Sequence, residues 1–182
     1  MRLVLLDRDG VLVEDRPDYV KHPGELVLLP GVGEALARLN RAGVPVALVT
    51  NQSVVGRGII NESMLHRIHD HLRSQLHREG AFLDAIYYAT DSPDAAGPRR
   101  KPNPGMLKEA LARFAAEPRT TPMVGDTLGD LEAAAAAGCQ RILVRTGKGA
   151  TTQAAGLPER VLPVAIYENL AEAVDALLKE RG

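Results

Sequence analysis

The sequence predicts an α/β protein, a three-layer α/β/α sandwich with a doubly wound, mainly parallel sheet. Short runs of consecutive apolar residues, such as residues 3–6, are typical of strands buried on both faces of a sheet. These runs alternate with longer segments whose apolar residues recur at helical spacing, which favours a parallel sheet covered by helices. The chain has no linker and no internal repeat, so its 182 residues are expected to form a single domain, residues 1–182.

The first half of the chain is expected to contain a strand, a polar loop or small flap, a helix, a second strand and a long helix. Pro30 and Gly31 mark the beginning of the first helix, and Gly43 is a suitable residue directly after its end. Asn61 is expected to cap the long helix, because its side chain can accept a hydrogen bond from a free N–H group of the first turn. These elements are expected at residues 3–6, 14–25, 32–42, 45–49 and 61–79.

The second half continues the alternation of strands and helices. Pro104 follows Asn103 and suits the first position of a helix, because a proline there loses no hydrogen bond. The alanine run that ends at Gly138 is strongly helical, and its small side chains allow close packing against a sheet. Strands are expected at residues 82–89, 122–124, 141–144 and, as a short edge strand, 161–167. Helices are expected at residues 104–114, 133–137 and 168–180, and loops at residues 90–100 and 145–156.

The bulk composition argues against several classes of protein. The net charge is -1 and basic residues do not cluster, which argues against a nucleic-acid-binding protein. Cys139 is the single cysteine, so neither an internal disulfide nor a cysteine-rich zinc site is expected. No apolar run is long enough to span a bilayer, and Asp7 lies too early for a signal peptide to precede it. We therefore expect a cytoplasmic protein that does not bind membranes, with a monomer as the default.

Four histidines lie on the long predicted helix, at positions 66, 69, 71 and 77. His66 and His69 have the i, i+3 spacing that would allow them to share a metal ion. No pattern of acidic partners supports such a site, so we expect these histidines on a solvated face of the helix.

Polar residues follow several predicted strands, and the right-handed crossovers of a parallel sheet bring such strand ends to one edge. Asp7 and Asp9 are two residues apart, and strand side chains at this spacing share a face. Two carboxylates at close distance repel each other unless a divalent cation lies between them or one is protonated. The pair therefore indicates a metal site, a proton-transfer role, or both. The polar residues expected at this edge are Asp7, Asp9, Thr50, Asn51, Arg100, Lys101, Asp126 and Asp130.

The residues at this edge suit phosphate chemistry with a hard cation. Carboxylate oxygens are ligands that Mg²⁺ prefers, and Mg²⁺ also binds phosphate oxygens. Thr50 and Lys101 suit a phosphoryl group, the lysine as a point charge that offsets the negative charge. A carboxylate can also attack phosphorus and form an aspartyl-phosphate. Asp9 adds a second carboxylate, which hydrolysis needs to pass protons in both directions.

Four motifs resemble those of the haloacid dehalogenase (HAD) superfamily. They are Asp7-x-Asp9-Gly10-Val11, Thr50 at the end of a strand, Lys101, and Gly125-Asp126-x-x-x-Asp130, in this order over nearly the whole chain. The resemblance implies a HAD-like Rossmannoid fold and phosphatase activity with Mg²⁺ as cofactor. No large insertion lies between the first two strands or before the lysine, so the chain resembles members without a large cap domain.

The resemblance also implies a role for each motif residue. Asp7 would be the nucleophile, and Asp9 would be the general acid that protonates the leaving group and then activates water. Thr50 and Lys101 would hold phosphoryl oxygens. Asp126 would complete the Mg²⁺ site together with the Asp7 carboxylate and the backbone carbonyl of Asp9.

Some of these residues have simpler interpretations. Thr50 on its own would be an ordinary strand residue, and Lys101 an exposed lysine before a proline. Asp130 would either orient the metal cluster from outside it or complement the dipole at a helix N-terminus, and the sequence leaves both open. Arg8 is expected to point to the opposite face of the strand, and we assign it no chemistry.

Within the superfamily, the chain resembles the branch of heptose-bisphosphate and histidinol-phosphate phosphatases. The matching segments include LDRDGV, VTNQS, MVGD and VRTGKG. The last segment and the Arg100-Lys101 pair favour D-glycero-D-manno-heptose 1,7-bisphosphate, because Arg100 can bind a second phosphate with two parallel hydrogen bonds. Histidinol phosphate or another small metabolite is the alternative substrate. The sugar side of the site is expected to be lined by Asp15, Arg16, Tyr19, Asn51, Gln52, Ser53 and Arg57.

The chain departs from this branch in one loop. Relatives commonly carry a Cys/His zinc cluster before the lysine, whereas the loop ATDSPDAAGPRRKP contains neither residue type. We therefore do not expect structural zinc, and we expect the prolines to order the loop.

A phosphoryl-accepting binding module of the receiver type is the alternative from another class. Receivers also combine an acidic cluster, a threonine and a lysine on a doubly wound sheet, but they are shorter and carry the accepting aspartate on a middle strand. The acidic pair on the first strand of this chain favours an enzyme, a phosphoric monoester hydrolase that acts on a small phosphorylated metabolite.

Overall fold

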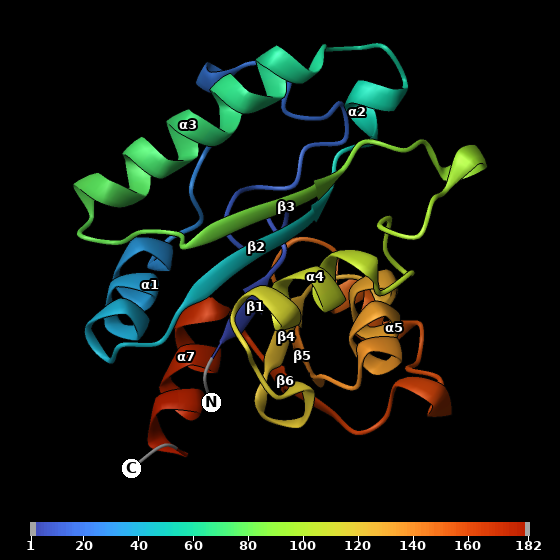
Figure 1. Cartoon of the computed structure of the whole chain (residues 1–182). Coiled ribbons are helices and arrows are strands. Elements are labelled where there is room, and N and C mark those ends of the chain that lie inside the picture. Colours follow the sequence, from blue (N-terminus) through green and yellow to red (C-terminus); the bar gives the residue numbers. More distant parts are fainter. Residues whose placement is uncertain (1–2, 181–182) are drawn as a thin grey trace.

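Six strands form one sheet in the order β3-β2-β1-β4-β5-β6 (Figure 1). The structure is a computed structural model that describes residues 3–180. Every strand pair in this part of the chain is parallel, so the predicted doubly wound fold is confirmed. The strands are β1 (Val4–Leu6), β2 (Val46–Asn51), β3 (Ala85–Ala89), β4 (Pro122–Gly125), β5 (Gln140–Val144) and β6 (Val164–Tyr167).

Helices cover both faces of the sheet. They are α1 (Val32–Arg41), α2 (Ser53–Gly56), α3 (Glu62–Arg78), α4 (Gly105–Arg113), α5 (Leu128–Ala137), α6 (Gly149–Ala154) and α7 (Leu170–Lys179). Short 3₁₀ helices lie at Pro23–Glu25, Pro93–Ala95, Pro118–Thr120 and Glu159–Val161. One face packs against α1, α3 and α7, and the other against α4 and α5 (Figure 1). Within the described residues, no helix has the length and apolar character needed to cross a membrane.

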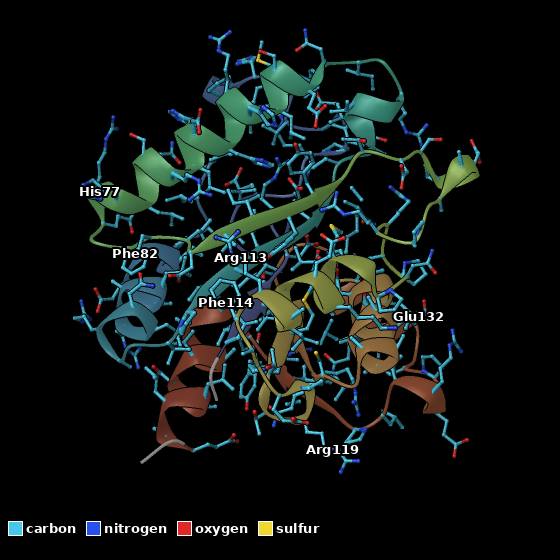
Figure 2. The ribbon with its side chains drawn as sticks, in the orientation of Figure 1. His77, Phe82, Arg113, Phe114, Arg119 and Glu132 are labelled. Carbon is cyan, nitrogen blue, oxygen red and sulfur yellow. The ribbon has the colours of Figure 1, made fainter. Side chains whose placement is uncertain are left out.

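The central strands bury both faces. In β1, Val4 and Leu6 join the apolar core under α1, α3 and α7, whereas Leu5 joins the core under α4 and α5. This period of two explains why the strand sequence shows no polar alternation. Leu6 pairs with residues of both β2 and β4, so the chain that follows β1 emerges between the carboxyl ends of these strands. His77 and Phe82 lie at the other edge of the molecule, away from these carboxyl ends and near the beginning of β3 (Figure 2).

Local signals account for several element boundaries. Asn61 caps α3 as predicted, because its Oδ1 accepts a hydrogen bond from the Met64 N–H at 2.8 Å. Gly43 follows α1 with a φ of 67°, a left-handed conformation that glycine adopts without a steric cost. The predicted strands and long helices are confirmed to within a few residues.

Some boundaries differ from the predictions. The loop expected at 145–156 contains α6, and the segment between β2 and α3, for which no element was expected, contains α2. α5 begins before the alanine run because the Thr127 side chain caps it. Pro104 is the residue before α4 rather than its first residue. The strand expected at 161–167 is shorter than predicted. Val161 is the last residue of a 3₁₀ turn, and β6 begins only at Val164.

Candidate active site

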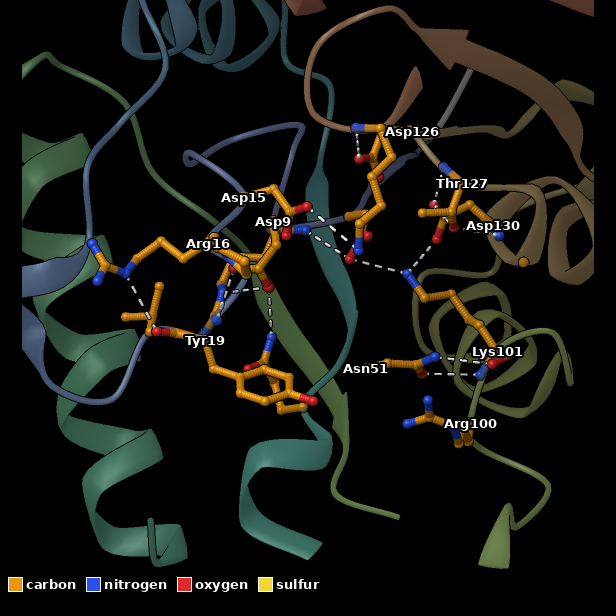
Figure 3. Close-up of a pocket in the computed structure, with 17 residues that line it drawn as sticks. Asp9, Asp15, Arg16, Tyr19, Asn51, Arg100, Lys101, Asp126, Thr127 and Asp130 are labelled. Atoms are coloured by element: carbon orange, nitrogen blue, oxygen red, sulfur yellow. Dashed lines mark hydrogen bonds and ion pairs between the residues drawn. The ribbon is translucent and has the colours of Figure 1, made fainter. Parts of the chain in front are cut away.

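The predicted residues meet in a cavity of about 490 Å³ at the carboxyl edge of the sheet (Figure 3). The chain enters this region from β1, β2 and β4, where the strand order reverses, which is the usual position of ligand sites in such sheets. Of the predicted site residues, the cavity is lined by Asp7, Asp9, Asp15, Arg16, Tyr19, Asn51, Gln52, Arg100, Lys101, Asp126 and Asp130.

Lys101 bridges two buried carboxylates. Its Nζ lies 3.0 Å from Asp7 Oδ1 and 2.6 Å from Asp130 Oδ1, and it donates to the Val49 carbonyl at 2.8 Å. Burial disfavours the charged ammonium, but the two carboxylates outweigh burial and raise the pKa of Lys101. The Asn51 side chain holds the lysine's backbone, donating to its carbonyl at 2.9 Å and accepting from its N–H at 3.0 Å. Lys101 is therefore a fixed positive charge beside Asp7.

Asp130 contacts both the first turn of a helix and the motif lysine, which correspond to the two roles that the sequence left open. It lies in the first turn of α5, where its Oδ2 accepts hydrogen bonds from the Thr127 N–H at 3.0 Å and the Thr127 hydroxyl at 2.6 Å. The Asp130 N–H donates to Thr127 Oγ1 in return, which completes a capping box. Its Oδ1 accepts from Lys101. Because both oxygens are engaged, we place Asp130 outside the ligand shell of a metal.

Asp126 follows β4 and is enclosed by two glycine-containing loops. Its Oδ2 accepts a hydrogen bond from the Lys148 N–H at 2.8 Å, whereas its buried Oδ1 has no hydrogen-bond partner among the described residues. Gly10 and Gly147 both have positive φ, and a Cβ at these positions would lie 2.1 and 2.3 Å from Asp126 Oδ2. The two glycines therefore leave the room that the Asp126 carboxylate occupies.

The carboxylates fit a divalent cation. One oxygen from each of Asp7, Asp126 and Asp130 lies within 4.8 Å of the others, which makes this a concentrated group of negative charges. Burial raises the pKa of Asp7 to about 7 and that of Asp126 to about 8, and neighbouring carboxylates add to both shifts. A hard cation such as Mg²⁺ would relieve this repulsion and would give the buried Oδ1 of Asp126 a partner. Asp7 and Asp126 are the candidate ligands, and the Asp9 carbonyl stays a predicted third ligand.

The Asp9 carboxylate has different surroundings from that of Asp7. Arg8 donates to it from Nε at 3.1 Å and from Nη2 at 3.0 Å, and Gln52 donates from Nε2 at 2.9 Å. The prediction that Arg8 points away from the site is wrong, since its side chain is buried and lines the cavity. β1 ends at Leu6, so the alternation of a strand does not extend to Arg8.

Of the predicted residues from Thr50 to Arg57, Asn51 and Gln52 line the cavity, whereas Thr50 is not among the lining residues. Thr50 is fully buried in β2, and its Oγ1 accepts a hydrogen bond from Gln52 Nε2 at 2.9 Å. Gln52 was expected on the sugar side, but its amide joins Thr50 to Asp9. Ser53 begins α2 and Arg57 follows it, and neither is among the residues that line the cavity.

His69 is buried, so the expectation of a solvated face is wrong for this histidine. It lies on the side of α3 that packs against the core, and its Nε2 is 3.4 Å from Arg8 Nη1. Burial, with the positive charge of Arg8 next, lowers the pKa of His69 to about 3. His66 is exposed as predicted, with its Nε2 2.8 Å from the Tyr88 hydroxyl.

Comparisons with known proteins identify the family. A HAD-hydrolase-like family model matches residues 98–173. A relative from Bordetella bronchiseptica, named D-glycero-beta-D-manno-heptose-1,7-bisphosphate 7-phosphatase, is 42% identical over 181 residues, which cover 99% of each chain. The chain belongs to the HAD superfamily.

Other HAD relatives match the chain over nearly its whole length. A protein of the same name from Pseudomonas aeruginosa is 41% identical and covers 97% of this chain and 98% of its own. The crystal structure of D,D-heptose 1,7-bisphosphate phosphatase from B. bronchiseptica, complexed with magnesium and phosphate, has a TM-score of 0.93 at 42% identity and covers 99% of each chain. The corresponding enzyme from Burkholderia thailandensis has a TM-score of 0.75 at 38% identity and covers 98% of this chain and 99% of its own. The predicted HAD-like fold is confirmed.

The loop before the motif lysine of this HAD protein is organised by hydrogen bonds. Asp91 Oδ2 accepts from the Gly97 N–H at 3.1 Å, and Asn103 Nδ2 donates to the Gly97 carbonyl at 3.0 Å. Arg100 Nη1 donates to the Asp91 carbonyl at 2.8 Å. Pro93 begins a single 3₁₀ turn, so prolines account for only part of the order that we attributed to them. The hydrogen bonds of Asp91 and Asn103 add to this order, and Arg100 lines the cavity.

Lys148 is a site residue of this HAD chain that the sequence motifs did not indicate. Lys148 lines the cavity, and its Nζ lies 3.4 Å from Asp15 Oδ2 on the predicted flap, where Arg16 and Tyr19 also line the cavity. Its segment, VRTGKG, favoured a branch of the superfamily and a substrate, but no role was assigned to the lysine itself. A basic residue in a glycine-containing turn after a strand was the available signal.

The raised pKa values predict how pH and Mg²⁺ act on stability. In the metal-free protein, folded Asp7 and Asp126 hold protons that the unfolded chain releases near pH 4, so stability is expected to fall as the pH rises from about 4 to 8. Mg²⁺ requires both groups ionised, so its stabilising effect should increase over the same range. At a concentration about a hundredfold above Kd, we expect the Mg²⁺-induced rise in Tm to reach roughly 5–10 °C at pH 8.

Thermal unfolding with and without Mg²⁺ at pH 6 and pH 8, with ionic strength matched by KCl, measures this effect. Asp126→Asn should remove most of the response. An equal rise in Tm at both pH values, or an unchanged response in Asp126→Asn, would contradict the assigned ligands.

Proposed function

We propose that the chain is a Mg²⁺-dependent phosphoric monoester hydrolase that removes the 7-phosphate of D-glycero-β-D-manno-heptose 1,7-bisphosphate. Relatives named for this reaction match 97–99% of the chain at 41–42% identity, which favours an enzyme over the receiver-type module. The observation that carries the proposal is a pair of carboxylates with different surroundings at one cavity. Asp7 lies beside a lysine and Asp9 beside an arginine.

Asp7 is the proposed nucleophile. Its Oδ1 accepts hydrogen bonds from the Arg8 N–H at 2.8 Å and interacts with Lys101 Nζ at 3.0 Å, whereas the described residues place no donor on Oδ2. Oδ2 is therefore free to attack phosphorus. The new O–P bond forms while the bond from phosphorus to the sugar oxygen breaks, which leaves an aspartyl-phosphate. Lys101 offsets the negative charge of the transferring phosphoryl group.

Asp9 is the proposed acid and base. It gives its proton to the departing sugar oxygen, and the resulting carboxylate then accepts a proton from the water that attacks the aspartyl-phosphate. This attack breaks the bond between phosphorus and the Asp7 oxygen, releases inorganic phosphate and restores protonated Asp9. Thr50 stays a predicted contact of the phosphoryl group.

Mg²⁺ would neutralise charge on the phosphoryl oxygens as they approach the Asp7 carboxylate. Asp7 and Asp126 are the residues proposed to hold it. The Lys148 N–H occupies one oxygen of Asp126, which leaves the buried Oδ1 for the metal.

The proposed substrate has a second phosphate that needs its own cation. Arg100 uses Nη1 to hold the Asp91 carbonyl and has further N–H groups for an anion. Lys148 and Arg16 line the same cavity and add positive charge. A cavity of about 490 Å³ is of a size that suits a small metabolite.

A substrate panel tests the proposal. We expect the β-anomer of heptose 1,7-bisphosphate to have a kcat/KM at least about tenfold above those of the α-anomer and histidinol phosphate, because only the β-anomer is expected to place both phosphates against the cations of the cavity. Inorganic phosphate release with Mg²⁺ gives the rates, and phosphorus NMR of the product shows which phosphate has left.

One variant and its matched control test the role of Arg100. Arg100→Ala should reduce the preference for the bisphosphate over a sugar monophosphate, whereas Arg99→Ala, which removes an exposed neighbour paired with Glu109, should not. Faster hydrolysis of histidinol phosphate would support the alternative substrate. A long-lived phosphoprotein with no turnover would support the receiver-type module.

That the chain is a cytoplasmic monomer with one domain, residues 1–182, stays a prediction.

A further inference from the structure

A buried arginine lies against the carboxylate that is proposed to transfer protons. Arg8 is 1% exposed, and two of its nitrogens face the two oxygens of Asp9, with Nε at 3.1 Å from Oδ2 and Nη2 at 3.0 Å from Oδ1. A guanidinium group is planar and rigid, so this two-point contact fixes the plane of the carboxylate as well as its distance. The orientation of Asp9 therefore depends on what holds Arg8.

His69 supports the third nitrogen of this guanidinium. Arg8 Nη1 lies 3.4 Å from His69 Nε2, and arginine has only donors, so Nε2 must accept and the imidazole must be neutral with its proton on Nδ1. The low pKa of His69 agrees with this state. The ring is fixed in turn by Tyr88, whose ring centre lies 5.7 Å from that of His69 and whose hydroxyl donates to Glu62 at 2.7 Å.

The contacts also distinguish the two oxygens of Asp9. Oδ2 accepts hydrogen bonds from Arg8 Nε and from Gln52 Nε2, whereas Oδ1 accepts only from Arg8 Nη2 among the described residues. Oδ1 therefore has the lone pair that can carry the transferred proton. Rotation of the guanidinium would turn this oxygen away from the leaving group.

We propose that His69, acting through Arg8, is a positioning residue that aims the Asp9 carboxyl group at the leaving oxygen. The proposal rests on the proposed role of Asp9 in the reaction. His69 comes from α3, Arg8 from the segment after β1 and Gln52 from the segment after β2, so three separate parts of the fold converge on one carboxylate. Removing the acceptor on His69 would leave a buried donor of Arg8 unpaired, and the guanidinium would move to find another partner.

A merely structural role for His69 predicts a different result. If the histidine only satisfied a buried charge, its loss would reduce the amount of active protein or disturb the whole site, and all substrates would be affected alike. A positioning role affects only substrates whose leaving group needs a proton. A sugar alkoxide needs one, whereas p-nitrophenolate is a stable anion and departs without one.

The ratio of two kcat/KM values separates these roles. The parameter kcat/KM covers the steps up to formation of the aspartyl-phosphate, so it reports protonation of the leaving group and not the later hydrolysis. Taking the ratio between the heptose bisphosphate and p-nitrophenyl phosphate cancels the fraction of correctly folded enzyme. The ratio therefore remains informative if a variant is partly unfolded.

Three variants complete the experiment. His69→Leu removes the acceptor, His69→Gln retains one, and His77→Leu makes the same change at the exposed far end of α3 (Figure 2). We expect His69→Leu to lower kcat/KM roughly 10- to 100-fold for the bisphosphate and less than about threefold for p-nitrophenyl phosphate. His69→Gln should recover most of the loss, and His77→Leu should behave as wild type.

The proposal is overturned if His69→Leu lowers both kcat/KM values by the same factor, or if its ratio equals that of His77→Leu. An equal loss with both substrates would assign His69 a structural role or an effect on the metal site. The function itself is tested by the wild-type enzyme. If the wild type prefers another alkyl phosphate, the ratio is measured with that substrate, so the two proposals fail separately.

Discussion

Replacing Asp7 by asparagine is expected to reduce phosphate release by about 10⁴-fold or more, because an amide cannot supply the oxygen nucleophile. The fold should remain intact. Burial already disfavours the charge on Asp7, as its raised pKa shows, and Lys101 retains Asp130 as a partner in the variant. We therefore expect the free energy of unfolding at pH 7.5 to change by less than about 1 kcal/mol in the absence of Mg²⁺.

Phosphate release and urea unfolding, measured on the same preparation, check this prediction. Asp70→Asn is a matched control, since it makes the same chemical change at an exposed position of α3. Activity near that of the wild type in Asp7→Asn would remove Asp7 from the role of nucleophile. Loss of activity accompanied by unfolding would leave the chemical role of Asp7 without support.

Replacing Lys101 by methionine is expected to damage both stability and activity. The methionine has a similar length but leaves the carboxylates of Asp7 and Asp130 buried without their cation. Breaking a buried pair in this way costs about 3–5 kcal/mol of folding free energy. The loss of the charge that faces the phosphoryl group should lower kcat roughly 10²- to 10³-fold in the protein that remains folded.

A second substitution separates the two effects. Asp130→Asn in the Lys101→Met background removes one of the unpaired charges, so it should recover part of the stability without recovering activity. Urea unfolding and phosphate release give the two quantities, and Lys108→Met, at an exposed position of α4, is the control. If the single variant is as stable as Lys108→Met, the buried ion pair does not have the strength that we assign to it.

Much of the fold was predictable because its signals are local. The β1 strand is an uninterrupted apolar run, and Asn61 caps α3 with a contact three residues away. The errors have local causes too. The Thr127 capping box begins α5 before the alanine run, and α6 lies in a segment with too little apolar periodicity to be recognised.

The candidate site was predictable to the extent that its residues follow strands. Asp7 and Asp126 come directly after β1 and β4, which are neighbours in the sheet, so the argument from parallel strand ends brought them to one cavity. Arg8 was misplaced because its expected direction rested on strand alternation, and β1 has already ended before this residue. Lys148 was missed because its one signal, a basic residue in a glycine-containing turn, does not indicate that the turn reaches Asp126.

The sequence by itself determined the order of strands and helices, the edge of the sheet where the chemistry lies, and the identity of the acidic residues there. These properties depend on short-range periodicity and on the geometry common to all parallel sheets. Only the tertiary structure decided which partners the charges have. Lys101 meets Asp130, and His69 meets Arg8, through contacts between residues 29 and 61 positions apart. Such contacts depend on how α3 and α5 pack onto the sheet, and this packing gives Asp7 and Asp9 their different surroundings.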